Sequence, residues 1–184
     1  MIYTGIGSRE TPSFYLYYFQ YIAQILAING FTLRSGAADG ADMSFEKGCD
    51  IVNGKKEIYL PWSNFNNSTS NLVLSFNDTK AYQMAASFHP RWDYLKQGAR
   101  KLHARNSLQL FGKDMNLASD FVLCWTKDGK GKGGTGQALR IARSYGIPVF
   151  DFGYSTPNNP HIIIDQFDEY IKNLKENDNG KEKR

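Results

Sequence analysis

The stretch Phe31–Glu46, FTLRSGAADGADMSFE, places a short apolar strand, a glycine-rich turn and the start of a helix in direct succession. Gly36 and Gly40 allow close backbone approaches, and amides in a turn that opens a helix point toward an anion. Three short polar side chains share the turn: Ser35, Asp39 and Asp42. An ordinary connection capped by Asp39 is the simpler interpretation of one such turn alone. Two further turns of this kind favour a phosphate-binding nest.

Apolar segments of strand length alternate with helical segments along the whole chain. The expected strands are Ile2–Thr4, Phe31–Arg34, Glu57–Leu60, Asp120–Trp125 and Ile147–Phe150. The expected helices are Phe14–Ile28, Ala41–Cys49, Lys80–Phe88, Tyr94–Leu110, Thr135–Tyr145 and Ile163–Leu174. Strands separated by helices imply a mostly parallel sheet with helices on both faces. The predicted fold is α/β and Rossmann-like, with three layers and about five strands.

The length of 184 residues, with 41% hydrophobic residues, suits one domain with a substantial core. We expect that domain to span 1–175, followed by a charged, disordered tail at 176–184. No apolar run reaches bilayer length, and the N-terminus leads directly into a strand, so we expect a cytoplasmic protein without a membrane partner. Cys49 and Cys124 lack a metal-binding spacing, so we predict reduced thiols, no metal and no cofactor.

The two further glycine turns follow the first and fourth expected strands. In open parallel sheets, ligands bind beyond the carboxyl ends of the strands, where the strand order reverses. If the second and third strands lie on one side of the first, and the fourth and fifth on the other, the reversal falls between the first and fourth strands. That order brings three turns to one crevice: Gly5–Arg9, Ser35–Asp42 and Gly131–Gln137.

The predicted ligand is a phosphate-bearing molecule, because glycine turns at helix N-termini converge with cationic side chains. We expect Arg9 and Arg105 to neutralise the phosphate, hydroxyl groups to donate to it, and Asp39 or Asp42 to accept from a ribose or base. Trp62 either lies against the base or packs under a loop. The predicted ligand-binding residues are Gly5, Gly7, Ser8, Arg9, Ser35, Gly36, Asp39, Gly40, Asp42, Trp62, Arg105, Gly133, Gly134, Thr135, Gly136 and Gln137.

The net charge of +4 is unevenly distributed. Between Arg91 and Arg143 there are eleven Lys or Arg residues against four Asp or Glu, a local excess of seven. This basic segment favours an anionic partner, although a solvated basic face is the alternative. Arg105 lies on the same helical face as Leu102, so it needs a polar partner there, which a buried salt bridge would also supply. The irregular segment Ser63–Asp78 is expected to be a long surface loop and a possible lid.

Four motifs resemble the SLOG superfamily of Rossmann-like proteins. They are Gly5-Ile-Gly-Ser-Arg9, Ser35-Gly-Ala-Ala-Asp-Gly-Ala-Asp42, His103-Ala-Arg-Asn106 and Gly133-Gly-Thr-Gly136. The resemblance covers nearly the whole chain up to about Phe150, and much of the sequence looks like the small SLOG proteins of bacterial and phage genomes. It implies homodimerisation and, for a phage protein, a location in the host cytoplasm.

SLOG proteins include the LONELY GUY phosphoribohydrolases, which cleave the N-glycosidic bond of nucleoside 5′-monophosphates using an arginine and the pattern GGxGTxxE. The arginine matches Arg105, but Gln137 stands at the threonine position and Arg140 at the catalytic glutamate position. A guanidinium cannot activate water or stabilise an oxocarbenium ion as a carboxylate does. Hydrolysis therefore remains an alternative in which one acidic residue takes over that role. The candidate catalytic residues are Asp39, Asp42, Glu46 and Arg105.

The superfamily also includes DNA-processing protein A, which binds single-stranded DNA and whose glycine-rich signature resembles Ser35–Asp42. The chain has no regular interleaving of basic and aromatic residues, so a nucleic-acid partner is possible but not indicated. The leading hypothesis is binding of a nucleotide or nucleotide-derived signalling ligand, by a protein that senses or sequesters it, as in anti-defence. Nucleotide hydrolysis and single-stranded DNA binding are the two alternatives.

Overall fold

The computed structural model describes residues 1–159 and 161–181 and contains one five-stranded sheet. The strands are β1 (Ile2–Gly7), β2 (Thr32–Ser35), β3 (Lys56–Ile58), β4 (Phe121–Trp125) and β5 (Val149–Asp151). Their order is β3-β2-β1-β4-β5, and every pairing is parallel. This is the strand order that the sequence analysis took as its condition, and the reversal accordingly falls between β1 and β4.

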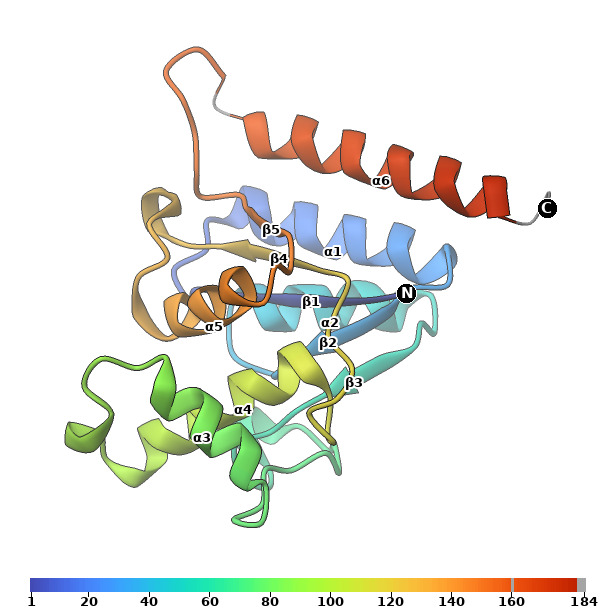
Figure 1. Cartoon of the computed structure of the whole chain (residues 1–184). Helices are drawn as coiled ribbons and strands as arrows, with labels where there is room; N and C mark the ends of the chain where they lie inside the picture. Colours follow the sequence, from blue (N-terminus) through green and yellow to red (C-terminus); the bar gives the residue numbers. More distant parts are fainter. Residues whose placement is uncertain (160, 182–184) are drawn as a thin grey trace.

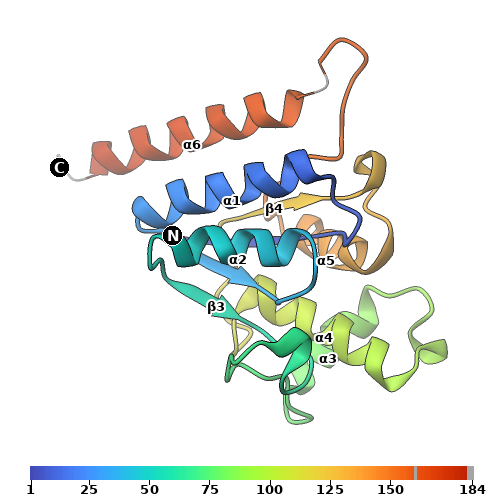
Figure 2. The same cartoon turned by 180° about the vertical axis from the view of Figure 1, so that it is seen from behind.

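Helices cover both faces of this sheet, which confirms the three-layer α/β fold (Figures 1 and 2). The helices are α1 (Ser13–Ile28), α2 (Ala41–Ile51), α3 (Thr79–Ser87), α4 (Gln97–Phe111), α5 (Gly133–Ser144) and α6 (Ile162–Lys181). Three short 3₁₀ turns lie between them: η1 (Phe65–Asn67), η2 (Trp92–Tyr94) and η3 (Lys127–Gly129). α1, α2 and α6 cover one face, α4 and α5 cover the other, and α3 packs on α4.

Strand β4 shows how one sequence serves both faces. Phe121, Leu123 and Trp125 enter the core beneath α1, α2 and α6, whereas Val122 and Cys124 enter the core beneath α4 and α5. All five residues of the strand are buried, as expected for a strand covered on both sides. Side chains alternate along a strand, so successive apolar residues of β4 pack into the cores on opposite faces of the sheet.

Several element boundaries differ from the sequence prediction by a few residues, and three of these differences change an interpretation. β1 continues through Gly7, so Gly5 lies in the strand and not in a turn; a Cβ there would lie 2.6 Å from the Phe45 ring of α2. α5 begins at Gly133, so the third glycine turn is partly helical. α6 continues to Lys181, so 176–181 of the predicted disordered tail are helical, and 182–184 lie outside the described residues.

The segment 63–78 is less of a surface loop than its composition predicts. Its 3₁₀ turn buries Phe65, and Leu60 forms an isolated parallel bridge with Val73. Asn64, Asn66 and Asn67 adopt left-handed backbone angles, which asparagine tolerates better than most residues. The asparagines therefore allow a tight turn, and this turn places the Phe65 side chain in the core.

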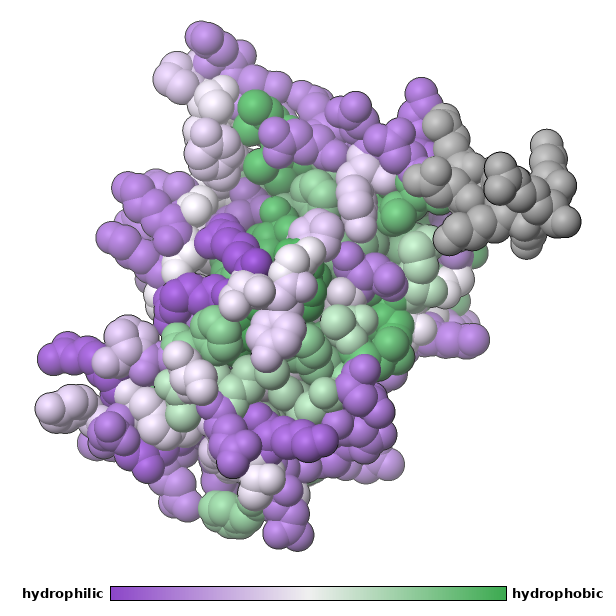
Figure 3. Space-filling model, viewed as in Figure 1, coloured by the Kyte–Doolittle hydropathy of each residue, from purple (hydrophilic) through white to green (hydrophobic). Residues whose placement is uncertain are grey.

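The surface on the side of α5 is mixed in polarity. In Figure 3, apolar side chains gather in the middle of this face, between the region of α6 and that of α3, and hydrophilic side chains surround them. None of the helices in the described part of the chain combines the length and hydropathy needed to cross a bilayer.

Gly48 tests how closely α1 and α2 pack. A Cβ at this position would overlap the backbone carbonyl oxygen of Gln20, which cannot move as a side chain can. We expect Gly48→Ala to lower the free energy of unfolding by about 1–3 kcal/mol, measured by urea denaturation. Gly98→Ala, in α4, is the matched control, because a Cβ there meets no atom within 4 Å. A control as destabilised as Gly48→Ala would contradict the close-packing argument.

Candidate ligand-binding site

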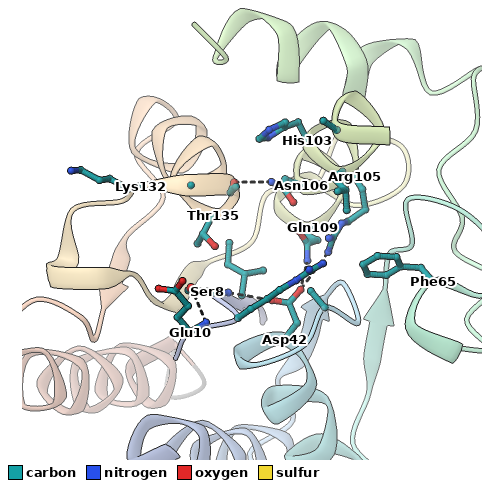
Figure 4. A pocket seen from close by; sticks show the side chains of 18 residues that line it. Ser8, Glu10, Asp42, Phe65, His103, Arg105, Asn106, Gln109, Lys132 and Thr135 are labelled. Carbon is teal, nitrogen blue, oxygen red and sulfur yellow. Dashed lines mark hydrogen bonds and ion pairs between the residues drawn. The ribbon is translucent and has the colours of Figure 1, made fainter. Parts of the chain in front are cut away.

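A cavity of about 450 Å³ opens beyond the carboxyl ends of β1 and β4 (Figure 4). Its walls come from the segment after β1, the start of α2, one face of α4 and the start of α5. The lining residues are Ile6, Gly7, Ser8, Arg9, Glu10, Ala38, Asp42, Phe65, Ala99, Leu102, His103, Arg105, Asn106, Gln109, Lys132, Gly133, Gly134 and Thr135. The three glycine-bearing segments therefore converge on one cavity, as the strand order predicted.

The N-terminus of α5 forms one wall of this cavity. Lys132 is its N-cap residue, and within the described part of the chain no side chain caps the first turn. A Cβ on Gly133 or Gly134 would meet no atom within 4 Å, so the backbone is open to an incoming group. The first turn contains no acidic residue, so the positive end of the helix dipole is not neutralised locally. This wall suits an anion.

A buried ion pair forms the opposite wall. Arg105 Nη1 lies 3.4 Å from Asp42 Oδ2, and the two residues are only 4% and 3% exposed. Asp42 Oδ1 also accepts a hydrogen bond from the Gly7 amide at 3.2 Å. Among the described residues, Arg105 Nε is buried without a hydrogen-bond partner. A guanidinium with an unused donor is costly to bury, so this arrangement is incomplete without a further acceptor.

Burial and pairing act on these two groups in opposite directions. Burial raises the pKa of the Asp42 carboxyl above its ordinary value, and Arg105 and the Gly7 amide partly counter that shift. Burial lowers the pKa of Arg105, and Asp42 counters it. The sequence analysis left open whether Arg105 serves a structural salt bridge or a ligand. The structure contains the salt bridge, and it also leaves Arg105 on the cavity wall.

Gly36 makes room for the Arg105 side chain. A Cβ at Gly36 would overlap Arg105 Nη1, so no other residue type fits this position without moving the guanidinium. Gln109 completes the contact: its side-chain oxygen accepts from the Gly36 amide and from Arg105 Nη1, both at 2.9 Å. The glycine that the sequence assigned to phosphate contact thus contacts an arginine instead.

A chain of amide side chains continues from Gln109 to α5. The Gln109 nitrogen donates to Asn106 Oδ1 at 3.1 Å. Asn106 Nδ2 in turn donates to the Gly134 carbonyl and to Gln137 Oε1, each at 3.2 Å. The hydrogen bond to Gly134 is drawn in Figure 4. These contacts hold the N-terminus of α5 at a set distance from the Arg105–Asp42 pair.

His103 lines the cavity at its upper rim in Figure 4. Its Nδ1 atom is buried without a partner among the described residues, and its ring lies 4.5 Å from the ring of His89. Burial lowers the pKa of His103, and the neighbouring His89 adds to the effect. The ring therefore favours the neutral form, which can donate or accept a hydrogen bond in the cavity.

Eight of the predicted ligand-binding residues line the cavity, and the other eight lie outside its lining. The latter are Gly5, Ser35, Gly36, Asp39, Gly40, Trp62, Gly136 and Gln137. Several of them build the site instead: the Ser35 hydroxyl donates to the Gly5 carbonyl at 2.7 Å, and Gln137 supports Asn106. Trp62 packs edge-on against Phe65. Phe65, and not Trp62, is the aromatic residue that lines the cavity.

The candidate carboxylates separate in the structure. Asp42 lines the cavity, whereas Asp39 is exposed outside it and Glu46 pairs with Lys56 at 2.8 Å on another surface. Arg140, at the position of the LONELY GUY glutamate, donates from Nε and Nη2 to the Phe88 carbonyl, both at 3.1 Å. The lining contains two carboxylates, Asp42 and Glu10.

Ten of the lining residues are absent from the predicted ligand-binding set. They are Ile6, Glu10, Ala38, Phe65, Ala99, Leu102, His103, Asn106, Gln109 and Lys132. On α4 a signal was present, since Leu102, Arg105, Asn106 and Gln109 share one helical face at spacings of three and four. No periodic signal marks Phe65, because it lies in an irregular segment. In the described residues, no group of three His, Cys, Asp or Glu side chains is placed to hold a metal ion.

Fold and geometry together define a Rossmann-like α/β protein with a cavity at its topological switch point. The structure is similar to that of DNA processing protein A from Helicobacter pylori, which was studied for its mode of binding single-stranded DNA. The TM-score is 0.53 at 23% sequence identity, over 82% of this chain and 63% of that chain, so the match spans less than two thirds of the neighbour. At this identity the likeness shows a shared fold. No family model and no curated protein matches the sequence.

Gly36→Ala tests the packing of Arg105. The added methyl group displaces the guanidinium from Asp42 and Gln109, so we expect a loss of about 3–5 kcal/mol in the free energy of unfolding, as for other broken buried ion pairs. Urea denaturation measures it. Gly134→Ala is the matched control, since a Cβ there is unobstructed. Equal stability of the Gly36→Ala and Gly134→Ala variants would contradict the packing described.

The raised pKa of Asp42 predicts a pH dependence of stability. Above the ordinary value of 3.8 and up to its raised pKa, the folded protein binds a proton at Asp42 that the unfolded chain does not. In that window the carboxyl therefore stabilises the fold increasingly as pH falls, by about 1.4 kcal/mol per unit of pKa shift. Asp42→Asn abolishes this contribution. Urea denaturation at several pH values measures the free energy of unfolding of wild type and Asp42→Asn. As the pH falls, the free energy of unfolding of wild type should rise relative to that of Asp42→Asn. A relative rise with increasing pH would refute the assignment.

Proposed function

We propose that this chain binds a nucleotide or nucleotide-derived ligand, with its phosphate at the N-terminus of α5. The observation that carries the proposal is Arg105, a guanidinium that is buried on the cavity wall, only 4% exposed, and has an unused Nε donor. Its contact with Asp42, at 3.4 Å, is longer than the roughly 2.7–2.9 Å typical of charge-assisted hydrogen bonds. Because Arg105 lines the cavity, an anionic group of a ligand would lie beside this incompletely neutralised guanidinium.

The charge distribution around the cavity supports an anion. Arg9 and Lys132 are exposed lining residues, one after β1 and the other at the N-cap of α5. Exposed cations attract an incoming phosphate, and the uncapped amides of α5 would hold it. The hydroxyl groups of Ser8 and Thr135 are further donors within the same lining.

The size and the apolar part of the cavity support a ligand larger than free phosphate. A volume of about 450 Å³ lies within the range of small-molecule sites, roughly 300–1,000 Å³. Phe65, Leu102, Ala38 and Ala99 give the lining an apolar portion suited to a sugar or base. Asp42 is an acceptor for a sugar hydroxyl or a base amine.

We favour binding, as in a sensor or a sequestering protein, over hydrolysis of the ligand. An N-glycosidase needs a carboxylate beside the scissile bond, and the position that supplies it in LONELY GUY enzymes is occupied by Arg140, which contacts Phe88. Asp42 is the buried carboxylate of the lining, and it is already engaged by Arg105 and Gly7.

Single-stranded DNA is a second candidate ligand. It is favoured by the structural neighbour, whose study concerns single-stranded DNA binding, and by the excess of basic residues between Arg91 and Arg143. The two candidates differ in salt dependence, because a strand that contacts several cations releases several counterions. A mononucleotide in one cavity releases few.

Isothermal titration calorimetry with AMP, GMP, CMP and UMP, and with oligo(dT), tests the proposal. We expect saturable binding of at least one mononucleotide. Arg9→Ala and Lys132→Ala should each weaken it by about tenfold, because each removes one charge-assisted contact to the phosphate. Lys130→Ala is the matched control, since Lys130 is an exposed cation two positions before Lys132 and outside the lining.

Two outcomes would overturn the nucleotide assignment. The first is no binding of any mononucleotide together with tight binding of oligo(dT) that weakens steeply with salt, which supports the DNA alternative. The second is mononucleotide binding that Arg9→Ala and Lys132→Ala leave unchanged, which places the ligand elsewhere. Release of free base from a mononucleotide, followed by chromatography, would instead establish the hydrolase.

A further inference from the structure

His103 lines the cavity and has no part in the function proposed above. It lies in α4 three residues before Asn106, so the two side chains share one face of that helix. Asn106 contacts α5 directly, through the Gly134 carbonyl and Gln137 at 3.2 Å each. In Figure 4 the His103 ring projects from α4 toward α5, on the same side as Lys132. The ring therefore faces the start of α5, where the phosphate is proposed to bind.

The groups that act on the charge of His103 come from three sides. Burial is the largest influence, and it lowers the pKa of His103. His89, which follows α3, Arg140 of α5 and Arg105 of α4 lower this pKa further, and a side-chain contact with Gln137 counters them in part. None of these groups is an anion. An anion bound beside the ring would therefore act in the opposite direction and favour the imidazolium form.

The pairing of His103 with His89 determines where an added proton would reside. The two rings lie 4.5 Å apart. His89 Nδ1 accepts a hydrogen bond from the Arg91 amide at 3.3 Å, and a protonated imidazole has no nitrogen free to accept. Two imidazolium rings this close would also repel each other. A proton taken up by the pair would therefore reside on His103, which is the ring that lines the cavity.

The cavity has a polar end and an aromatic end. In Figure 4, Lys132, Thr135 and His103 lie toward one end, and Phe65 lies at the other. The donors of the polar end come from α4, from α5 and, with Ser8, from the segment after β1. Donors on three sides suit a phosphate with three free oxygens, whose fourth oxygen is esterified and points toward Phe65. A monoester has three free oxygens, whereas a diester has two.

We propose that His103 is a phosphate ligand of this site, and that the site is built for a phosphate monoester, which His103 meets as an imidazolium. This role rests on the proposed function, because it places the phosphate at the N-terminus of α5. A monoester carries close to two negative charges above about pH 7, and a diester carries one. The second charge offsets the burial and the cationic neighbours of His103. The proton comes from solvent as the ligand binds, so the complex holds one proton more than the free protein and ligand.

Proton NMR of the imidazole signals tests this role on the wild-type protein. The chain has three histidines, and His103→Gln identifies the signal of His103. Saturation with methyl phosphate, a monoester, should raise the midpoint of the His103 titration by about one pH unit or more. Dimethyl phosphate, a diester, should raise it by less. His161, which is exposed and outside the lining, should keep its midpoint with both probes.

The affinity for methyl phosphate should show the matching pH dependence. The wild type takes up a proton at His103 on binding and His103→Gln does not, so affinity should rise in wild type as the pH falls. From about pH 8 to about pH 6.5 the gain over His103→Gln should reach about tenfold, measured by calorimetry. The comparison cancels the titration of the ligand itself. His161→Gln is the matched control and should follow wild type, and circular dichroism verifies that both variants fold.

A His103 midpoint that methyl phosphate leaves unchanged would overturn this role, and equal shifts with both probes would overturn the preference for a monoester. These outcomes are distinct from failure of the nucleotide assignment. If Arg9→Ala weakens mononucleotide binding while methyl phosphate does not move the His103 midpoint, the nucleotide site stands without His103. If the midpoint rises although no mononucleotide binds, His103 remains a phosphate ligand and the nucleotide assignment is wrong.

Discussion

The pairing of Arg105 with Asp42 is the interaction on which the site depends, because it joins elements that are distant in sequence. Asp42 belongs to the first turn of α2 and Arg105 to α4, on opposite sides of the sheet edge, and Gly36 at the end of β2 leaves the space between them. Two charges buried at 3.4 Å stabilise the fold little by themselves, since desolvation offsets most of their attraction. Such a pair is better explained by a requirement for a cation at that place than by stability.

The glycines of the three turns have two different structural roles, close packing and open backbone, and the sequence alone does not distinguish them. Gly5 and Gly36 lie where a side chain would meet Phe45 or Arg105, so they allow elements to approach one another. Gly133 and Gly134 have no such neighbour and leave backbone open to the cavity. The proposed phosphate site would need both kinds, because open amides are useful only if the surrounding helices hold them near a charge.

The fold class was predictable from the sequence because alternation of strands and helices leaves few possible topologies, whereas the strand order was only one of the orders that this alternation allows. The site was predictable where it followed the topology, as for Arg9, Arg105 and Thr135. The lining was not predictable where residues about one helical turn apart point in different directions. Asp42 and Glu46 are four residues apart on α2, yet Asp42 faces the cavity and Glu46 reaches Lys56 on another surface. Phe65 enters the cavity from an irregular turn that no period describes.

The cavity and helix α1 are joined by one short segment of chain. Arg9 and Glu10 line the cavity, and α1 starts only a few residues later, at Ser13. The Thr11 hydroxyl donates to the Ser8 carbonyl at 2.7 Å and ties the junction together. A ligand that contacts Arg9 would therefore act, through this junction, on the segment that leads into α1. Because binding free energies are reciprocal, any event on α1 that is coupled to ligand binding through this junction must change ligand affinity by the same free energy as the ligand changes that event.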